Sequence, residues 1–279
     1  MQVRIVLFSE DEALAITNAR RAFVEIDRLD AIFSDYRVDS ELNILVRQAV
    51  DSARVVSPEL FSVLTRAQEM AAWSGGAFDV TVGPLSQLWR KARRLQTRPP
   101  ADELEVAKQK TGWRLIKLSP TSGKVQLLRQ GLQLDLGGIA KGFIAEAALN
   151  ALRKAGCPRA MVEIGGEVAI GAPPPDTKGW WVNLPNDTQK PLHLLRGVTV
   201  STSGDTEQFV ELNGVRYSHI LDPRTGLGLT SRISVTVIAS DGALADALST
   251  TLSVLGEQAI PAARKRFKGI QIFFRRATG

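Results

Sequence analysis

The sequence predicts an α+β fold, because segments with helical patterns and segments with strand patterns are partly segregated along the chain. Helical patterns dominate residues 9–110, and strand patterns dominate residues 159–237. We therefore favour α+β over a doubly wound parallel sheet. Neither an internal repeat nor a low-complexity linker is visible, and a length of 279 residues suggests one large domain or two small ones.

The first part of the chain carries clear helix starts. A strand pattern over residues 3–8 is followed by Ser9, a capping residue, and by acidic residues that favour a first helical turn. Apolar residues, among them Ile16, Phe23 and Leu29, then recur at helical spacing and predict one buried face. A serine–proline pair marks another strong start further along. Helices are therefore expected from Ser9, from Ser40, over residues 57–74 and over residues 101–110.

From residue 113 onward the pattern is mostly one of strands and turns. Two helical patterns interrupt it, over residues 139–155 after a glycine-rich turn and over residues 241–255 before Gly256. Strands are expected over residues 113–118, 132–136, 160–164, 179–184, 198–201, 209–212, 233–239 and 270–274.

Composition restricts the function classes without choosing among them. With 44% hydrophobic and 23% charged residues, the chain is typical of a soluble globular protein. Its net charge of +6 suits a polyanionic small molecule, an anionic membrane surface or nucleic acid. The densest basic patch, residues 90–94, is expected to be a solvated helix face or loop. Nucleic-acid binding is the weakest option, because the few aromatic residues form no regular stripe with the basic ones.

The rare residue types exclude several kinds of site. Two histidines, His193 and His219, are too few for a multi-histidine metal centre. The single Cys157 cannot form an intrachain disulfide and is expected to be a small buried residue. No transmembrane segment is expected, since no apolar run is long enough to span a bilayer, and no export signal is visible at the start. The chain is thus expected to be either cytoplasmic or a trimmed mature form.

Two motifs suggest a site for an anion next to a cation. Residues 135–142, Asp-Leu-Gly-Gly-Ile-Ala-Lys-Gly, form a glycine-rich turn that opens a helix, and Lys141 adds positive charge where a diphosphate could lie. Asp246 and Thr250 share one helix face, where a carboxylate and a hydroxyl can ligate a hard cation such as Mg²⁺. Each motif also has a simpler interpretation: a tight turn with a surface lysine, and a locally capped aspartate.

His219 is a candidate acid–base group, because it lies close in sequence to Asp222 and Arg224. A lone histidine is more often structural, and His193, which has no such neighbours, is interpreted in that way. The other small-residue loops with a carboxylate are individually compatible with ordinary turns or an edge strand. They contain Asp79, Asp205 and Glu163.

In this order, the motifs resemble the ApbE family of FAD:protein FMN transferases. The resemblance runs over residues 3–256, nearly the whole chain. Any one motif is unspecific, but seven in the family's order are hard to obtain by accident. The motifs occupy residues 34–36 with 39–42, 76–85, 135–142, 163–167, 202–205, 219–226 and 245–250.

The resemblance implies a set of site residues and a fold. The side chains of Asp246 and Thr250 and the backbone carbonyl of Gly138 match the family's metal ligands, with Mg²⁺ as the expected ion. His219 matches the histidine held necessary for transfer. The fold that the resemblance implies is a single α+β domain over residues 1–279, with mixed, mainly antiparallel sheets, flanking helices and FAD in a cleft. Positions that match FAD contacts are Lys141, Asp79 and Tyr36, the last lying against the flavin or the adenine.

One departure concerns the start of the chain. Family members usually have a Met-Gly-Thr stretch that touches FAD just before the first strand, whereas this chain opens Met-Gln-Val-Arg. Because family members are often exported, we take a trimmed N-terminus as a hypothesis. The resemblance then suggests a periplasmic or membrane-anchored extracytoplasmic location, with a membrane tether in an untrimmed form.

The expected reaction transfers FMN from FAD to a threonine or serine hydroxyl of a target protein and releases AMP. Two alternatives remain open. Water could replace the protein hydroxyl, which would make the chain an FAD diphosphatase that yields FMN and AMP. A flavin-binding protein without enzymatic activity would require the metal site to be absent or inert.

Overall fold

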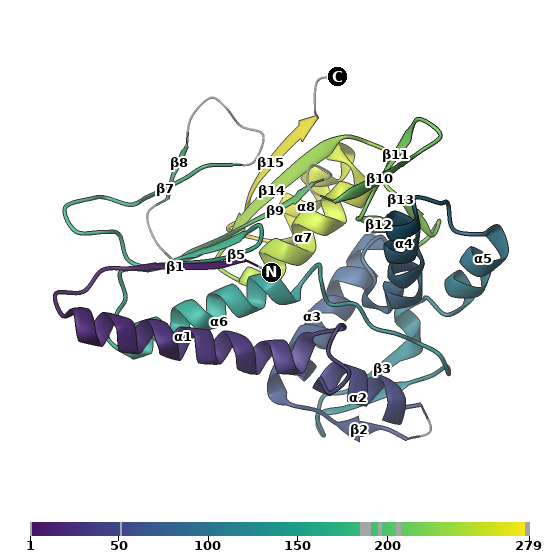
Figure 1. Cartoon of the computed structure of the whole chain (residues 1–279), viewed down its shortest axis with the longest axis horizontal. Helices are drawn as coiled ribbons and strands as arrows, with labels where there is room; N and C mark the ends of the chain where they lie inside the picture. Colours follow the sequence, from purple (N-terminus) through teal and green to yellow (C-terminus); the bar gives the residue numbers. More distant parts are fainter. Residues whose placement is uncertain (1, 51, 185–190, 195–196, 205–207, 277–279) are drawn as a thin grey trace.

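The structure, a computed structural model, describes residues 2–50, 52–184, 191–194, 197–204 and 208–276. Its centre is a six-stranded antiparallel sheet with the strand order β1-β5-β6-β9-β14-β15 (Figure 1). The strands of this sheet are β1 (Val3–Leu7), β5 (Ala160–Ile164), β6 (Glu167–Ile170), β9 (Val198–Gly204), β14 (Ile233–Ala239) and β15 (Gln271–Arg276).

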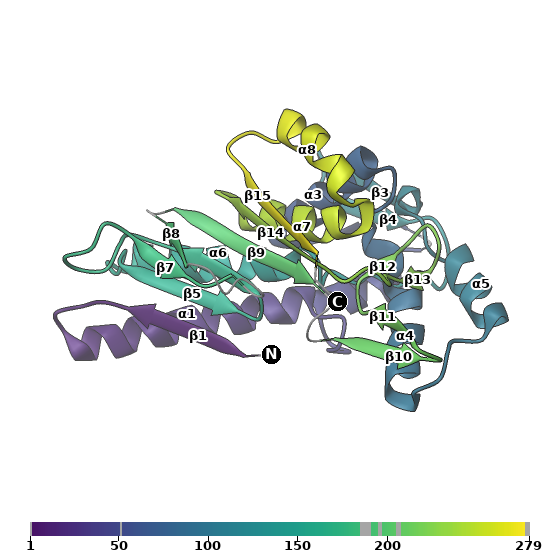
Figure 2. The ribbon, with the colours of Figure 1, turned by 90° about the horizontal axis from the view of Figure 1, so that it is seen from above.

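Two layers of helices cover one face of the sheet. Helices α6 (Ala140–Lys154) and α7 (Gly242–Leu255) pack directly on the strands. Helix α1 (Glu12–Phe33) packs on α6, and α3 (Pro58–Ser74) packs on α7, as Figures 1 and 2 show from two sides. The apolar faces of these helices and of the sheet merge in one core. Burial of this kind, about 25 cal/mol per Å² of apolar surface, is the main force that holds the layers together.

The opposite face of the sheet is covered by the hairpin of β7 (Trp180–Val182) and β8 (Leu192–Leu194). Trp180 from this hairpin packs with Met161, Ile170 and Val200 from the sheet. Strand β14, which lies between β9 and the edge strand β15, is buried along its whole length because it has protein on both faces. The end of β14 leads directly to α7, so the sheet fixes where α7 begins.

The remaining elements form the other half of the molecule. Helices α4 and α5 share a small apolar cluster with the two short hairpins that follow β9. A three-stranded sheet with the order β2-β4-β3 lies near α2. The helices are α2 (Glu41–Gln48), α4 (Gly83–Leu95), α5 (Ala101–Gln109) and α8 (Ile260–Arg266), with one-turn 3-10 helices at Val80–Val82, Trp113–Leu115 and Glu257–Ala259. The strands are β2 (Arg54–Val55), β3 (Ile116–Ser119), β4 (Lys124–Leu127), β10 (Phe209–Leu212), β11 (Val215–Ser218), β12 (Leu221–Asp222) and β13 (Leu227–Gly228).

The predicted α+β class is confirmed, and every strand pairing within the described ranges is antiparallel. The strand predicted over residues 132–136 is wrong, although Leu132, Leu134 and Leu136 are buried alternately as a strand would bury them. The backbone N–H of Asp135 donates to the carbonyl of Val80 in a 3-10 helix, and no strand among the described residues pairs with this segment.

Two smaller expectations also need correction. The strand predicted over residues 113–118 begins only at Ile116, because the residues before it form a 3-10 turn. On α1, Ile16 and Phe23 are exposed, whereas Ala22 and Leu29 are buried against the neighbouring helices. None of the helices in the described ranges combines the length and apolar character needed to cross a bilayer.

Candidate active site

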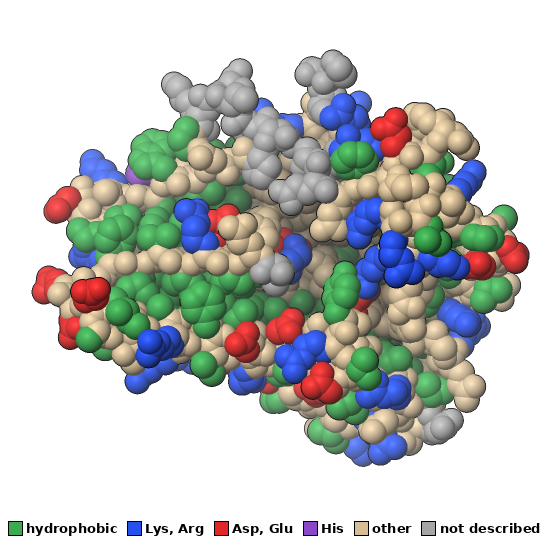
Figure 3. Space-filling view, viewed as in Figure 1, with side chains coloured by type: hydrophobic (Ala, Val, Ile, Leu, Met, Phe, Trp, Pro, Cys, Tyr) green, Lys and Arg blue, Asp and Glu red, His purple; other side chains and the backbone are tan. Residues whose placement is uncertain are grey.

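The glycine-rich turn and the start of α7 meet where α6 crosses α7. Gly142 and Gly242 touch through their backbones, because a Cβ built on Gly142 would overlap the carbonyl of Gly242 and lie 3.0 Å from Cβ of Asp246. This crossing puts the Asp246 carboxylate against the start of α6, where its Oδ2 accepts a hydrogen bond of 3.1 Å from the N–H of Gly142. Figure 3 shows the surface hollowed in the middle of the view, between the sheet and the half that carries α4.

Thr250 lies one helical turn after Asp246 and faces the same glycine-rich turn. A Cβ on Gly138 would lie 3.1 Å from the Thr250 hydroxyl oxygen and 3.4 Å from the Phe78 ring, so only glycine leaves this space open. The structure thus brings together Gly138, Asp246 and Thr250, the three residues predicted to bind a metal. Their role as ligands remains a prediction.

The Asp246 carboxylate lies in surroundings that call for a cation. The residue is 1% exposed, and burial raises the pKa of its carboxyl, while the charge of Lys141 and the backbone N–H groups of Gly142 and Lys141 lower it. A buried charge without a strong partner is costly. In the described parts of the chain, no three Asp, Glu, His or Cys side chains gather as a metal cluster. One carboxylate, one hydroxyl and a backbone carbonyl are nevertheless a hard oxygen set that suits Mg²⁺, which commonly completes its shell with water and substrate phosphates.

Lys141 projects from the first turn of α6 toward a buried carboxylate. Its Nζ lies 2.5 Å from Oε1 of Glu167, a residue at the start of β6 that is 1% exposed. The other carboxylate oxygen, Oε2, is buried and has no hydrogen-bond partner among the residues that the structure describes. Burial, together with the nearby charge of Asp246, raises the pKa of Glu167 to about 7, although Lys141 opposes that rise. The sequence motif contained Glu167, but its pairing with Lys141 was not predicted.

A chain of hydroxyl groups connects Glu167 with the predicted metal ligands. Ser201 donates to Oε1 of Glu167 over 3.4 Å and lies 3.1 Å from the hydroxyl of Ser249. Ser203, one of the residues of the predicted small-residue loop, lies 2.8 Å from Ser249 and 3.1 Å from Oγ1 of Thr250. These contacts join β9 to α7, and the one from Ser203 orients the hydroxyl of Thr250. Asp205, from the same predicted loop, lies outside the described residues.

Asp79 is buried next to the glycine-rich turn and caps the 3-10 helix that precedes α4. Its Oδ1 accepts hydrogen bonds from the backbone N–H and the hydroxyl of Thr81, at 2.8 Å and 2.7 Å. Burial raises the pKa of the carboxyl, and the two bonds from Thr81 partly offset that rise. These contacts hold the segment that carries Phe78 against Gly138. The FAD contact implied for Asp79 stays a prediction.

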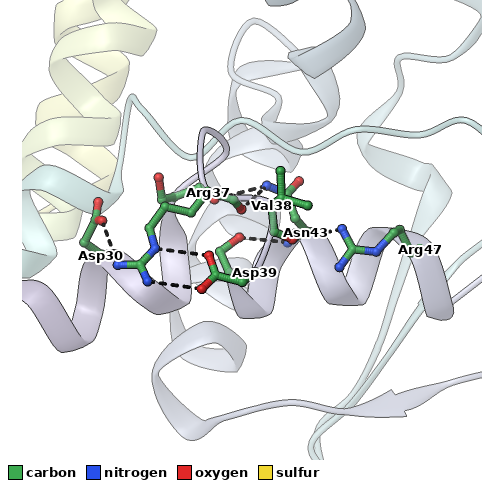
Figure 4. Close-up of polar contacts among 8 residues, drawn as sticks. Asp30, Arg37, Val38, Asp39, Asn43 and Arg47 are labelled. Atoms are coloured by element: carbon green, nitrogen blue, oxygen red, sulfur yellow. Dashed lines mark hydrogen bonds and ion pairs between the residues drawn. The ribbon is translucent and has the colours of Figure 1, made fainter.

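Tyr36 lies on the turn between α1 and α2, and it is 73% exposed. The turn is held from below by the side-chain amide of Asn43, which donates to the carbonyls of Ser34, Asp35 and Arg37 at 3.3, 3.2 and 2.8 Å. Figure 4 shows this bracing together with further polar contacts along the turn, which join Arg37 to Asp30 and Asp39 and Arg47 to the carbonyl of Val38. An exposed ring on a braced turn is well placed to meet a ligand.

Arg90 corrects the expectation that residues 90–94 form a solvated basic face. Its guanidinium is half-buried, with Nη1 at 2.5 Å from Oδ2 of Asp35 and Nη2 at 3.0 Å from Oδ2 of Asp135. The same group lies over the Tyr36 ring, 4.4 Å from its centre. No local sequence pattern identifies Arg90 as a site residue, because its partners are far away along the chain. The one signal in the sequence was that two of the motifs contain a carboxylate, Asp35 and Asp135, that could pair with an arginine.

His219 lies between β11 and β12, and its side chain is exposed to solvent. Its backbone N–H donates to the carbonyl of Gln208 at 3.0 Å, and its Nδ1 lies 3.0 Å from the same oxygen. Surrounding protein partly desolvates the imidazole, and this, together with the charges of Lys141 and Arg93, lowers the pKa of His219 despite that carbonyl. The neutral ring can therefore accept a proton near pH 7.

The other residues near His219 in sequence have structural contacts of their own. Asp222 pairs with Arg224 at 2.8 Å within the turn after β12. His193 stacks on Trp181 in the β7–β8 hairpin, with ring centres 4.6 Å apart, as its structural interpretation predicts. Cys157 is buried beside Asn18, also as expected.

Known proteins resemble this chain over nearly its whole length. A sequence model described as the ApbE family matches residues 1–274. An FAD:protein FMN transferase of Chlamydia muridarum is 34% identical over 94% of this chain and 84% of its own length. The FAD:protein FMN transferase of Treponema pallidum is 33% identical over 97% of this chain and 80% of its own length.

Solved structures have the same fold. The flavin transferase ApbE of Vibrio cholerae superposes with a TM-score of 0.84 at 29% identity, over 99% of this chain and 90% of that one. The ApbE protein of Thermotoga maritima gives a TM-score of 0.84 at 30% identity, over 99% and 93% of the two chains. The match from the first strand to the last, together with the site built around Asp246 and Lys141, shows that this chain belongs to the ApbE family.

Proposed function

We propose that this chain is a metal-dependent FAD:protein FMN transferase, which moves the FMN half of FAD onto a threonine or serine hydroxyl of a target protein and releases AMP. Membership of the ApbE family makes the chain an enzyme, and the names of its relatives support this reaction. The observation that carries the proposal is the juxtaposition of the Asp246 carboxylate, the Thr250 hydroxyl and the Lys141 ammonium around one glycine-rich turn.

The metal ligands proposed are the side chains of Asp246 and Thr250 and the carbonyl of Gly138. A Mg²⁺ ion bound there would act as a Lewis acid on phosphate oxygens. The open space at Gly138 supports this assignment, because a side chain at that position would crowd the Thr250 hydroxyl. A buried Asp246 without a cation would also be a costly arrangement.

The remaining residues bind the dinucleotide and handle the proton. Lys141 and the first turn of α6 offset the negative charge of the diphosphate, which phosphoryl transfer requires more than covalent help. His219 accepts or orients the proton of the target hydroxyl. The hydroxyl oxygen then forms a bond to the FMN-side phosphorus, the bond from that phosphorus to the bridging oxygen breaks, and AMP leaves with that oxygen. Tyr36, which is exposed, and Asp79, which is buried, are the further residues proposed to contact FAD.

Intact-mass spectrometry of a target polypeptide after incubation with the chain, FAD and Mg²⁺ tests the proposal. The expected result is a mass gain equal to one FMN on a threonine or serine, with AMP in the supernatant. Free FMN and AMP with an unmodified target would instead indicate FAD hydrolysis. FAD that stays intact throughout would contradict both activities. An Asp246→Ala variant is expected to fold and to lose the reaction, and unchanged activity of that variant in excess Mg²⁺ would remove the metal assignment.

A further inference from the structure

Arg90 joins three segments that are distant in sequence. It belongs to α4, and its guanidinium contacts Asp35 on the turn after α1 and Asp135 at the start of the glycine-rich turn. The side chains of Arg90, Asp35 and Asp135 are 29%, 18% and 13% exposed, so water screens these contacts only partly. A planar guanidinium can satisfy two carboxylates at once, which a lysine ammonium cannot do with the same geometry.

The contact between Arg90 and Asp135 connects Arg90 to the predicted metal ligands. Oδ1 of Asp135 accepts a hydrogen bond of 2.9 Å from the N–H of Gly137, while its Oδ2 is held by Arg90. The next residue, Gly138, lies against the Thr250 hydroxyl. Arg90 therefore holds the carboxylate that shapes the turn at the point where its carbonyl is proposed to bind the metal.

The contact between Arg90 and Asp35 connects Arg90 to Tyr36. Asp35 directly precedes Tyr36, and the guanidinium that pairs with Asp35 also lies 4.4 Å from the centre of the Tyr36 ring. The turn itself is fixed at its base by Asn43. Through these contacts, Arg90 connects the turn that carries Tyr36 to the glycine-rich turn.

Arg90 also separates two carboxylates that repel each other. Burial and the negative charge of Asp135 raise the pKa of Asp35, and the hydrogen bond and charge of Arg90 oppose that rise. Without the guanidinium, two partly buried like charges would face each other, and the two segments would lose their attraction.

We propose that Arg90 is a positioning residue for FAD binding, which holds Tyr36 and the glycine-rich turn at the spacing that the dinucleotide requires. This inference rests on the proposed function, since it assigns FAD to the space between these two segments. Arg90 acts through Tyr36 and Asp135 and takes no part in the chemical step itself.

The test compares FAD affinities of single and double variants by the quenching of FAD fluorescence in the presence of Mg²⁺. Arg90→Met is expected to weaken FAD binding about tenfold, and Tyr36→Leu by a similar factor. If Arg90 acts through Tyr36, the double variant binds FAD about as weakly as either single variant, because contacts in one network are not additive. Independent losses that multiply to about a hundredfold would contradict the inference.

Three further variants separate positioning from folding. Arg94→Met removes an exposed arginine from the next turn of α4 and is expected to leave FAD affinity unchanged. Asp35→Asn keeps the contact between Arg90 and Asp135 and weakens only the tie to the turn, so it should lower FAD affinity even if Arg90→Met fails to fold. Arg90→Lys should restore affinity in part. FAD affinities of Asp35→Asn and Arg94→Met that both equal that of the unaltered chain would overturn the inference.

Transfer of FMN by the unaltered chain is followed in parallel. Its absence would contradict the proposed function, whereas the pattern of FAD affinities decides the role of Arg90. The two failures are therefore distinguishable in one set of measurements.

Discussion

The ammonium of Lys141 lies 2.5 Å from the carboxylate of Glu167, which is almost wholly buried beneath it. The cation that the glycine-rich turn offers to a diphosphate is therefore held in place before any ligand arrives. A charged side chain that is already positioned stabilises a transition state more than one that must be ordered during the reaction.

Glu167→Gln should slow FMN transfer by about tenfold to a hundredfold, because Lys141 loses the charge that orients it. FAD is still expected to bind, since Lys141 remains present. Steady-state rates with saturating FAD measure the effect. Glu163→Gln is the matched control, because Glu163 forms an ion pair with Arg4 near the sheet edge. Equal rates in both variants would show that the Glu167 contact has no part in transfer.

The pKa of Glu167, raised to about 7 in the metal-free chain, predicts a pH dependence of stability. Between pH 4.5, its ordinary value, and about 7, the folded chain holds a proton that the unfolded chain releases. Unfolding therefore releases a proton, and the free energy of unfolding falls as the pH rises through this range. Denaturant unfolding of the metal-free chain and of Glu167→Gln over this range tests the prediction. The difference in free energy of unfolding between the unaltered chain and Glu167→Gln should change in disfavour of the unaltered chain as the pH rises. If the free energies of the two chains changed with pH in parallel, the prediction would be contradicted.

His219→Ala should lower the rate of FMN transfer by about 10²–10⁴ while FAD binding is retained, as expected for the loss of a general base. Because its pKa is lowered, His219 stays neutral below the ordinary value of 6.5, so the acid limb of the pH–rate profile should lie under that pH. His193→Ala, the only other histidine, serves as the control and should transfer FMN normally. A full rate in His219→Ala would remove the proton-accepting role.

Gly142→Ala should destabilise the fold by about 3 kcal/mol or more, because the added methyl group would overlap the backbone of Gly242 and force α6 away from α7. Ala151→Gly, on the same helix, is expected to cost only about 1 kcal/mol through helix propensity. Chemical unfolding measures both. If Gly142→Ala were no more destabilising than Ala151→Gly, the close crossing of the two helices would be incorrect.

The sequence could predict those parts of the site whose residues are close along the chain. Asp246 and Thr250 are one helical turn apart, and their place on one face follows from helix geometry alone. Lys141 in the first turn of a helix after a glycine-rich turn was identifiable in the same way. Asp246 and Thr250 lie next to the glycine-rich turn only because α6 and α7 cross there. No local sequence pattern predicts that crossing.

The contacts that no local pattern predicts join residues that are distant in sequence. Arg90 is 55 residues from Asp35 and 45 residues from Asp135, so it looked like part of a solvated basic patch. The wrong strand over residues 132–136 has a related cause. Alternating burial requires only an extended chain between two packed surfaces, whereas a strand also requires a hydrogen-bonded neighbour.

The location of the metal relative to the dinucleotide can be measured directly. A crystal of the chain grown with FAD and Mn²⁺ should show one anomalous scattering peak in contact with Asp246, Thr250 and the carbonyl of Gly138. The FAD diphosphate should then lie between that peak and the ammonium of Lys141. A peak at any other place, or a diphosphate bound away from α6, would contradict the account.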